Sequence, residues 1–119
     1  MFFLSENTLM IANQTRFFRG QLVRHQRYGY RGVIVEYDLA CRAPDTWYLK
    51  NLTQPLRQQP WYHVLVHESS TATYAAEISL YDDDDPQPIV HPLISVLFDD
   101  FDGKRYIRND HRWPGWETE

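Results

Sequence analysis

Short runs of alternating hydrophobic and polar residues recur along the chain, and each run has the length of one β-strand. In the clearest run, residues 32–38, Val33, Val35 and Tyr37 fall on one face and Ile34 falls on the other with the acidic residues. Residues 61–67 alternate in the same way and are rich in aromatic and β-branched types, which favour strands. The pattern therefore predicts two central β-strands.

Weaker patterns predict the other elements. Residues 16–25 begin a first strand, and a hairpin turn at 68–71 leads into a returning strand over 72–80. Residues 46–51 predict a short helix with Asp45 as its N-cap, and Pro92 suits the first turn of another helix that runs to about Phe98. Residues 99–104 predict a turn, and residues 105–108 predict a last short strand that closes the sheet.

Five short strands with long connections are typical of a mainly β protein, here a small SH3-like barrel of about five strongly bent antiparallel strands with one or two short helices. We expect one domain at residues 16–108. An N-terminal arm at 1–15, with a short strand or helical turn around Thr8–Ala12, precedes it, and a C-terminal tail at 109–119 follows it.

The chain carries one cysteine, Cys41, so no disulfide forms within it. The N-terminus lacks the features of a secretory signal, and no apolar run approaches the length of a membrane span. These features predict a cytoplasmic protein, one that is associated with the nucleoid if it binds DNA.

The charge is divided along the chain. Residues 1–66 carry eight Lys or Arg and four Asp or Glu, whereas residues 67–119 carry four Lys or Arg and twelve Asp or Glu. The formal net charge of −4 argues mildly against nucleic acid as a ligand. A basic face formed by the first half still permits it, because local potential governs encounter more than net charge does.

The densest basic and aromatic cluster lies between the first two predicted strands, where three arginines alternate with a histidine and two tyrosines. Guanidinium groups form bidentate hydrogen bonds with phosphate, and flat rings stack on bases. Two interpretations of this cluster are equally supported. Either it forms a binding surface, or the tyrosines fill one end of a barrel and the arginines are solvated. For the first, the candidate DNA contacts are Arg19, Arg24, Arg27, Tyr28, Tyr30, Arg31 and Lys50.

Catalytic and metal motifs are absent from the sequence. The segment at residues 99–103 lacks the ligand spacing of a calcium loop, and the five histidines with one cysteine give no zinc spacing. No nucleophile motif surrounds Cys41, which is typical of a small buried hydrophobic residue. We therefore expect a protein that is not an enzyme and that needs no cofactor and no metal.

Several segments together resemble the HspQ/YccV-like family, also called the hemimethylated-DNA-binding domain. Residues 24–34 (RHQRYGYRGVI) resemble its first motif, residues 59–66 (QPWYHVLV) its second, and residues 73–77 (TYAAE) its third. His91-Pro92-Leu93-Ile94 and residues 98–106 match longer members, including a domain found in some F-box proteins. The resemblance covers about residues 18–108 and implies a small SH3-like barrel.

The resemblance implies two functions of different classes. The first is binding of hemimethylated DNA, for which the basic residues above are the candidates. The alternative is a protein-interaction module in the stress response, which acts as a specificity factor or adaptor for a Lon-type ATP-dependent protease or its substrates. The candidate partner contacts for this alternative are the acidic run and the tail tryptophans: Asp82, Asp83, Asp84, Asp85, Trp113 and Trp116.

Overall fold

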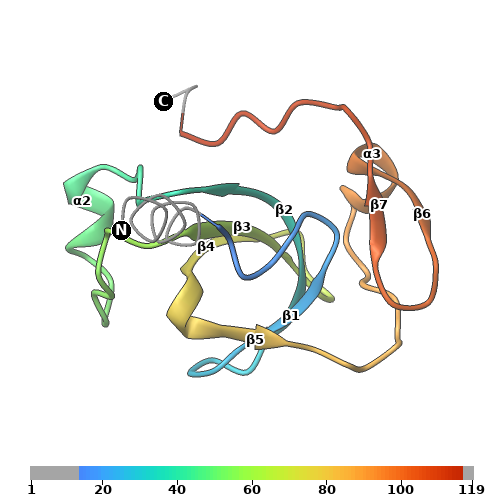
Figure 1. The fold of residues 1–119 in the computed structure, drawn as a ribbon, viewed down its shortest axis with the longest axis horizontal. Coiled ribbons are helices and arrows are strands. Elements are labelled where there is room, and N and C mark those ends of the chain that lie inside the picture. The colour runs from blue at the N-terminus through green and yellow to red at the C-terminus, as the bar shows by residue number, and fades with distance from the viewer. Residues whose placement is uncertain (1–13, 117–119) are drawn as a thin grey trace, which may run out of the picture.

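Short elements follow one another between residues 22 and 108 in the computed structural model, which describes residues 14–116 (Figure 1). The element expected around Thr8–Ala12 lies outside the described residues. In chain order the elements are β1 (Leu22–His25), β2 (Arg31–Asp38), α2 (Asp45–Tyr48), β3 (Trp61–Val66), β4 (Ala72–Ala76), the 3₁₀ helix η1 (Glu77–Ser79), β5 (Leu80–Asp82), α3 (Ile94–Leu97), β6 (Phe98–Phe101) and β7 (Tyr106–Arg108).

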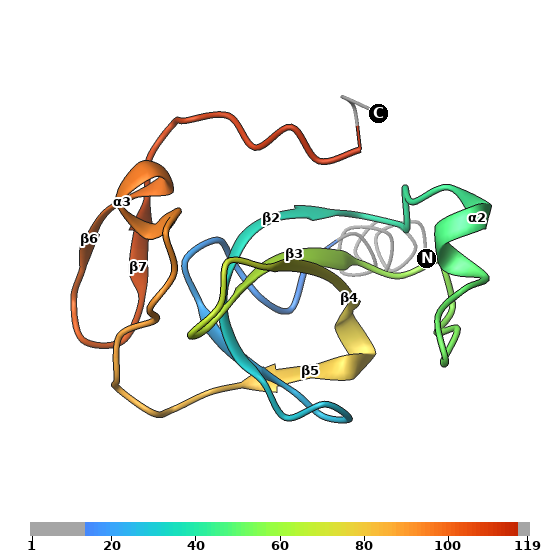
Figure 2. The ribbon, with the colours of Figure 1, turned by 180° about the vertical axis from the view of Figure 1, so that it is seen from behind.

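The main sheet has five antiparallel strands in the order β4-β3-β2-β1-β5, so the mainly β class predicted from the sequence is confirmed. The sheet bends strongly, and η1 forms the corner between β4 and β5 (Figures 1 and 2). Within residues 14–116 no strand pairing joins β4 to β5, so the hydrogen-bonded ring is not closed.

The strand predicted over residues 72–80 is interrupted at Glu77, where η1 begins. The Glu77 backbone N–H donates to the Pro60 carbonyl at 2.9 Å, and its carboxylate accepts a 2.7 Å hydrogen bond from the Tyr62 hydroxyl. The Arg16 backbone N–H donates to the same carboxylate oxygen at 2.9 Å. These contacts hold the corner, which alternation of residue types does not reveal.

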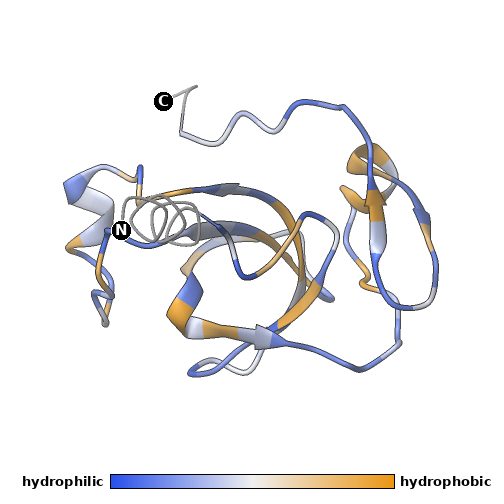
Figure 3. Cartoon of the chain, viewed as in Figure 1, coloured by the Kyte–Doolittle hydropathy of each residue, from blue (hydrophilic) through white to orange (hydrophobic). Residues whose placement is uncertain are grey.

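A β-bulge in β2 changes the predicted distribution of side chains. The register shifts between Ile34 and Glu36, so the alternation breaks at Val35. As a result Tyr37 packs with the cluster that contains Ile34 and Tyr62, and not with Val33 and Val35 as predicted. The two faces of β2 therefore belong to two separate hydrophobic clusters. Figure 3 shows the apolar residues concentrated along the bent strands and around α3.

The β6 and β7 strands form a separate two-stranded sheet, and two predictions are wrong here. Residues 98–101 are a strand, although 99–104 was predicted to be a turn, and β7 pairs with β6 instead of closing the main sheet. A single bridge, Gln21 to Arg105, connects this hairpin to the main sheet. The hairpin buries aromatic surface, because the Phe98 and Phe101 rings lie 5.2 and 4.4 Å from the Tyr106 ring between centroids.

Among residues 14–116, the helices α2 and α3 are single turns. Pro44, and not Asp45, occupies the N-cap position of α2, and α3 begins at Ile94, two residues after Pro92. After β7 the chain runs back across the molecule from the hairpin end toward α2 (Figures 1 and 2). This path brings the C-terminal tail to the end of the sheet that carries the aromatic residues.

Candidate nucleic-acid interface

The imidazole of His25 organises the turn between β1 and β2. Its Nδ1 accepts hydrogen bonds from the backbone N–H groups of Arg27 and Tyr28, both at 3.1 Å. Gly29 closes the turn with φ of +73°, a conformation that glycine adopts without strain. The His25 ring stacks on Tyr28 with 4.7 Å between centroids and contacts Tyr30 at 5.1 Å. The turn thus presents Tyr28, which is 55% exposed, on a buried histidine.

This geometry requires a neutral His25, because a protonated Nδ1 has no lone pair to accept either bond. Burial, with a further contribution from Arg27, lowers the pKa of His25 below the ordinary value of 6.5. The unfolded chain therefore takes up the proton first as the pH falls below 6.5, and the turn loses stability in that range. We expect the hydrogen-exchange protection factors of the Arg27 and Tyr28 amides to fall at least about five-fold from pH 7.5 to pH 5, the equivalent of one hydrogen bond of ~1 kcal/mol.

His25→Asn provides the matched control. Its side-chain oxygen accepts from the same backbone donors in an Asx-type turn and does not titrate. Protection of the two amides in this variant is expected to stay constant over the same pH range. Equal pH dependence in both proteins would show that His25 does not hold the turn.

A second group of rings comes from three distant segments. Trp47 of α2, Tyr74 of β4 and Trp116 of the tail contact one another edge to face, with centroid distances of 5.2–5.8 Å. The Tyr74 hydroxyl donates a 2.6 Å hydrogen bond to Asp38, which raises the pKa of Tyr74 together with burial. The ring of His63 lies 4.5 Å from Tyr74, and burial lowers its pKa although Asp38 opposes the shift. These rings form one wall of closely packed aromatic side chains.

A cavity of about 360 Å³ opens between the two groups. Both groups line it, and within residues 14–116 no ring of the β1–β2 turn contacts a ring of the second group. No Asp or Glu is among the described residues that line it. The lining consists of His25, Tyr28, Tyr30, Trp47, Asn51, His63, Ala72, Thr73, Tyr74, Ala75, Trp113, Gly115 and Trp116. We call this cavity the aromatic pocket.

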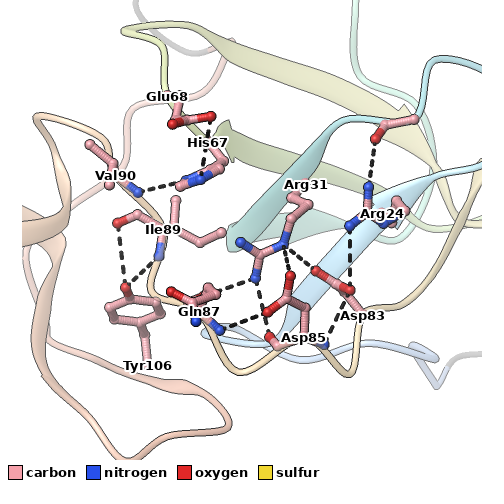
Figure 4. Close-up of polar contacts among 11 residues, drawn as sticks. Arg24, Arg31, His67, Glu68, Asp83, Asp85, Gln87, Ile89, Val90 and Tyr106 are labelled. Carbon is pink, nitrogen blue, oxygen red and sulfur yellow. Dashed lines mark hydrogen bonds and ion pairs between the residues drawn. The ribbon is translucent and has the colours of Figure 1, made fainter.

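The predicted DNA contacts divide into buried and exposed residues. Arg31 is only 9% exposed, and its Nε donates to the Asp83 carboxylate at 2.6 Å (Figure 4). Its NH2 group donates to the backbone carbonyls of Asp85 at 3.2 Å and Gln87 at 2.8 Å. Arg24 donates to the Gly29 carbonyl at 2.9 Å and lies 3.9 Å from Asp83. Both arginines therefore brace the fold around the turn.

The other basic candidates lie at the surface. Arg27 is exposed, and its guanidinium lies over the Tyr28 ring at 5.8 Å. Lys50 is exposed next to Asn51, which lines the aromatic pocket. Arg19 pairs with Glu36 at 2.7 Å and covers the Tyr37 ring at 4.5 Å. Arg27 and Lys50 are thus next in sequence to residues that line the pocket. The third cation, Arg19, is compensated by the carboxylate of Glu36.

The structure separates the predicted partner contacts. Within the acidic run, Asp83 is buried against Arg31. Asp82 accepts a 2.8 Å hydrogen bond from Gln21, and Asp84 is exposed. Asp85 caps the Gln87 backbone N–H at 3.0 Å. Trp113 and Trp116, predicted with this run, instead line the aromatic pocket beside Tyr28 and Tyr30.

Sequence reasoning missed several pocket residues. Trp47 falls in the short helix predicted at residues 46–51 and His63 in the strand predicted at residues 61–67, and neither was among the candidate contacts for DNA or for a partner. Tyr74 and Asn51 were not singled out. The available signal was the density of aromatic residues in the segments around residues 47, 61 and 74. That density alone is also typical of a hydrophobic core.

Residues 14–116 contain neither a cluster of metal ligands nor a membrane-spanning helix. No group of three or more His, Cys, Asp or Glu stands close enough to hold a metal ion there. Cys41 is partly buried and packs against the cluster around Trp61 and Tyr74. None of the helices in this part of the chain is long and apolar enough to cross a membrane.

The structure is a small β domain whose bent antiparallel sheet carries an aromatic pocket, with exposed cations adjacent to it in sequence. A family model described as "Hemimethylated DNA-binding protein YccV like" matches residues 15–105. The chain belongs to this YccV-like family, and the family predicted from its three motifs is confirmed.

Similar proteins with curated names are the F-box only protein 21 of Pongo abelii, Homo sapiens and Mus musculus. Each is 37% identical to this chain over 93 residues, which cover 76% of the chain. The match spans only 15% of the length of each relative, so it concerns one domain of those proteins.

Proposed function

We propose that this domain binds DNA without catalysing a reaction and that the aromatic pocket lies at the centre of the contact surface. The observation that carries the proposal is a ring-lined pocket without lining carboxylates, adjoined by two exposed cations, Arg27 and Lys50. The description of the matching family supports the same ligand. Cations hold phosphates, and rings contact bases.

The internal ion pair between Arg31 and Asp83 removes one acidic and one basic residue from the surface and leaves the net charge unchanged. Asp83 is neutralised by Arg31 and shielded from solvent, so it contributes little repulsion toward phosphate. We assign Arg27, Lys50 and Tyr28 to direct contact and Arg24 and Arg31 to support of the turn. Arg19 is compensated by Glu36, and the proposal does not depend on it.

The salt dependence of binding tests the proposal. Each phosphate that the protein neutralises contributes about −0.9 to the slope of log K against log salt concentration on duplex DNA. Arg27→Gln and Lys50→Gln are each expected to reduce the magnitude of that slope by about 1 and to weaken binding of all sequences alike. Fluorescence anisotropy with a labelled duplex at four salt concentrations measures both quantities.

Lys104→Gln is the matched control because it removes the same charge from the exposed turn of the β6–β7 hairpin, away from the aromatic pocket. This variant is expected to keep the wild-type slope. A flat salt dependence in the wild type, or equal losses in all three variants, would contradict the proposal.

The finer expectation is a preference for hemimethylated DNA. Titration of one duplex in its methylated, hemimethylated and unmethylated forms measures it. Tighter binding of the hemimethylated form supports this preference. Equal affinity for the three forms would leave a general DNA-binding domain.

A second candidate is the protein-interaction module that serves a Lon-type protease. One observation favours a protein partner: Leu49, Leu52 and Leu56, which follow the end of α2, are 64%, 81% and 77% exposed. Leu52→Ser together with Leu56→Ser is expected to abolish such an interaction and to leave DNA binding intact, because neither change adds charge beside Lys50. Co-sedimentation with the purified protease, with and without its substrates, measures the loss.

A further inference from the structure

We infer that the aromatic pocket receives a single nucleobase that has left the base stack of DNA bound on the same face. This inference rests on the proposed function and adds to it a specific subsite. It differs from phosphate binding, because it concerns the rings and the floor of the pocket and not the cations around it.

The shape of the pocket favours a flat ring. The rings of the β1–β2 turn and those around Tyr74 line the same cavity without touching one another. Ala72 and Ala75 of β4 also line the cavity, and their side chains fill little of it because they are short. The volume of about 360 Å³ lies at the small end of the range of about 300–1,000 Å³ typical of small-ligand pockets. A planar heterocycle uses such a space through contact with ring faces.

The polar groups of the pocket fit the edge of a base. The Asn51 side-chain N–H group donates to the Trp47 carbonyl at 3.0 Å, which leaves its carboxamide oxygen as an acceptor. The Thr73 hydroxyl already shares a 2.8 Å hydrogen bond with Tyr30. An exocyclic amine complements a carboxamide oxygen, so the pocket favours adenine, cytosine or guanine over thymine.

The charges argue against the other ligand that ring-lined pockets commonly hold, a methylated ammonium group. A cation gains from a carboxylate beside the rings, but the described lining residues include no Asp or Glu. Asp38 is the carboxylate next to the Tyr74 wall, and the hydroxyl of Tyr74 and the imidazole of His63 already occupy it. Arg27 and Lys50 instead suit the phosphates that flank a base.

The cost of removing a base from the stack supplies a test. That cost is smallest for a base without a pairing partner, so a pocket for an unstacked base selects such DNA. The probes are a matched duplex, the same duplex with one bulged adenine, and the same duplex with a bulged abasic site. We expect the bulged adenine to bind about ten-fold more tightly than the matched duplex, and the abasic bulge to lack that gain.

Two tyrosine variants localise the effect. Tyr28→Ala removes an exposed ring of the pocket and is expected to abolish the ten-fold preference. Tyr81→Ala removes a tyrosine of similar character from β5, 40% exposed and outside the pocket lining, and is expected to keep it. Equal loss in both variants, or the same gain for the abasic bulge, would overturn the inference.

The outcomes separate this inference from the proposed function. Equal affinity for matched and bulged duplexes overturns the base pocket and leaves DNA binding in place. Absence of binding to any duplex overturns the proposed function. Quenching of tryptophan fluorescence by an adenine trinucleotide then tests whether the pocket binds a base. Quenching that depends on Tyr28 keeps the inference. Absence of quenching, or quenching only by a trimethyllysine peptide, overturns it.

Discussion

Replacement of Arg31 by alanine is expected to destabilise the domain by about 3–5 kcal/mol, because the change leaves the Asp83 carboxylate buried without its partner. The same guanidinium also holds the backbone carbonyls of Asp85 and Gln87. Its loss therefore frees the segment that links β5 to the β6–β7 hairpin. Urea denaturation followed by tryptophan fluorescence measures the free energy of unfolding.

Arg24→Ala is the control for this experiment. Arg24 is partly exposed and lies 3.9 Å from Asp83, so its removal is expected to cost less than about 1 kcal/mol. The double variant Arg31→Ala with Asp83→Ala removes both charges and is expected to recover part of the lost stability. If Arg31→Ala unfolds no more easily than Arg24→Ala, the buried pair does not stabilise the fold.

This result bears on how binding data are interpreted. Under the proposed function, we expect a DNA-binding defect in Arg31→Ala to arise through the disturbed turn and not through a lost phosphate contact. Such a defect is expected to accompany the stability loss. The defects of Arg27→Gln and Lys50→Gln are expected without any change in unfolding free energy, since both side chains are exposed.

Gly20→Ala is expected to cost about 3 kcal/mol or more and to detach the β6–β7 hairpin from the main sheet. Gly20 has φ of +93°, and a Cβ there would overlap the carbonyl group of Tyr106. Its N–H donates to the Ile34 carbonyl at 2.7 Å, and its carbonyl accepts from the Tyr106 N–H at 2.9 Å. Denaturation gives the loss, and amide exchange at Tyr106 locates it.

Gly103→Ala isolates the steric part of this effect. Gly103 has nearly the same φ, +94°, but no described atom lies within 4 Å of an added Cβ. Its replacement is expected to cost only the conformational penalty of about 1–2 kcal/mol. Equal losses at the two glycines would mean that the close approach at Gly20 relaxes without consequence.

Alternation of residue types was sufficient to predict the central strands β2 and β3, because both faces of these strands are buried in register with their neighbours. It failed at Tyr37, since the bulge at Val35 depends on the pairing with β3. It failed again at the β6–β7 hairpin. There Phe98 and Phe101 form a strand because their rings pack on Tyr106, and the acidic residues between them only resemble a turn.

The candidate site was predictable in its residue types but not in its assembly. Tyr28, Tyr30, Trp113 and Trp116 were all singled out from the sequence, yet for two different ligands. The ion pair of Arg31 was not predicted for the same reason: its partner Asp83 lies 52 residues away, and no local pattern connects them. Which charged side chains face solvent depends on contacts between residues that are far apart in the chain. Local patterns in one sequence do not show these contacts.

The path of the tail separates two properties of this domain. The family match ends at residue 105, whereas Trp113 and Trp116 line the aromatic pocket from beyond that limit. The bent sheet, the ion pair and the β1–β2 turn lie within the match. The matched segment therefore contains the strands of the main sheet, whereas the lining of the pocket also depends on tail residues that pack against the hydrophobic clusters of the domain.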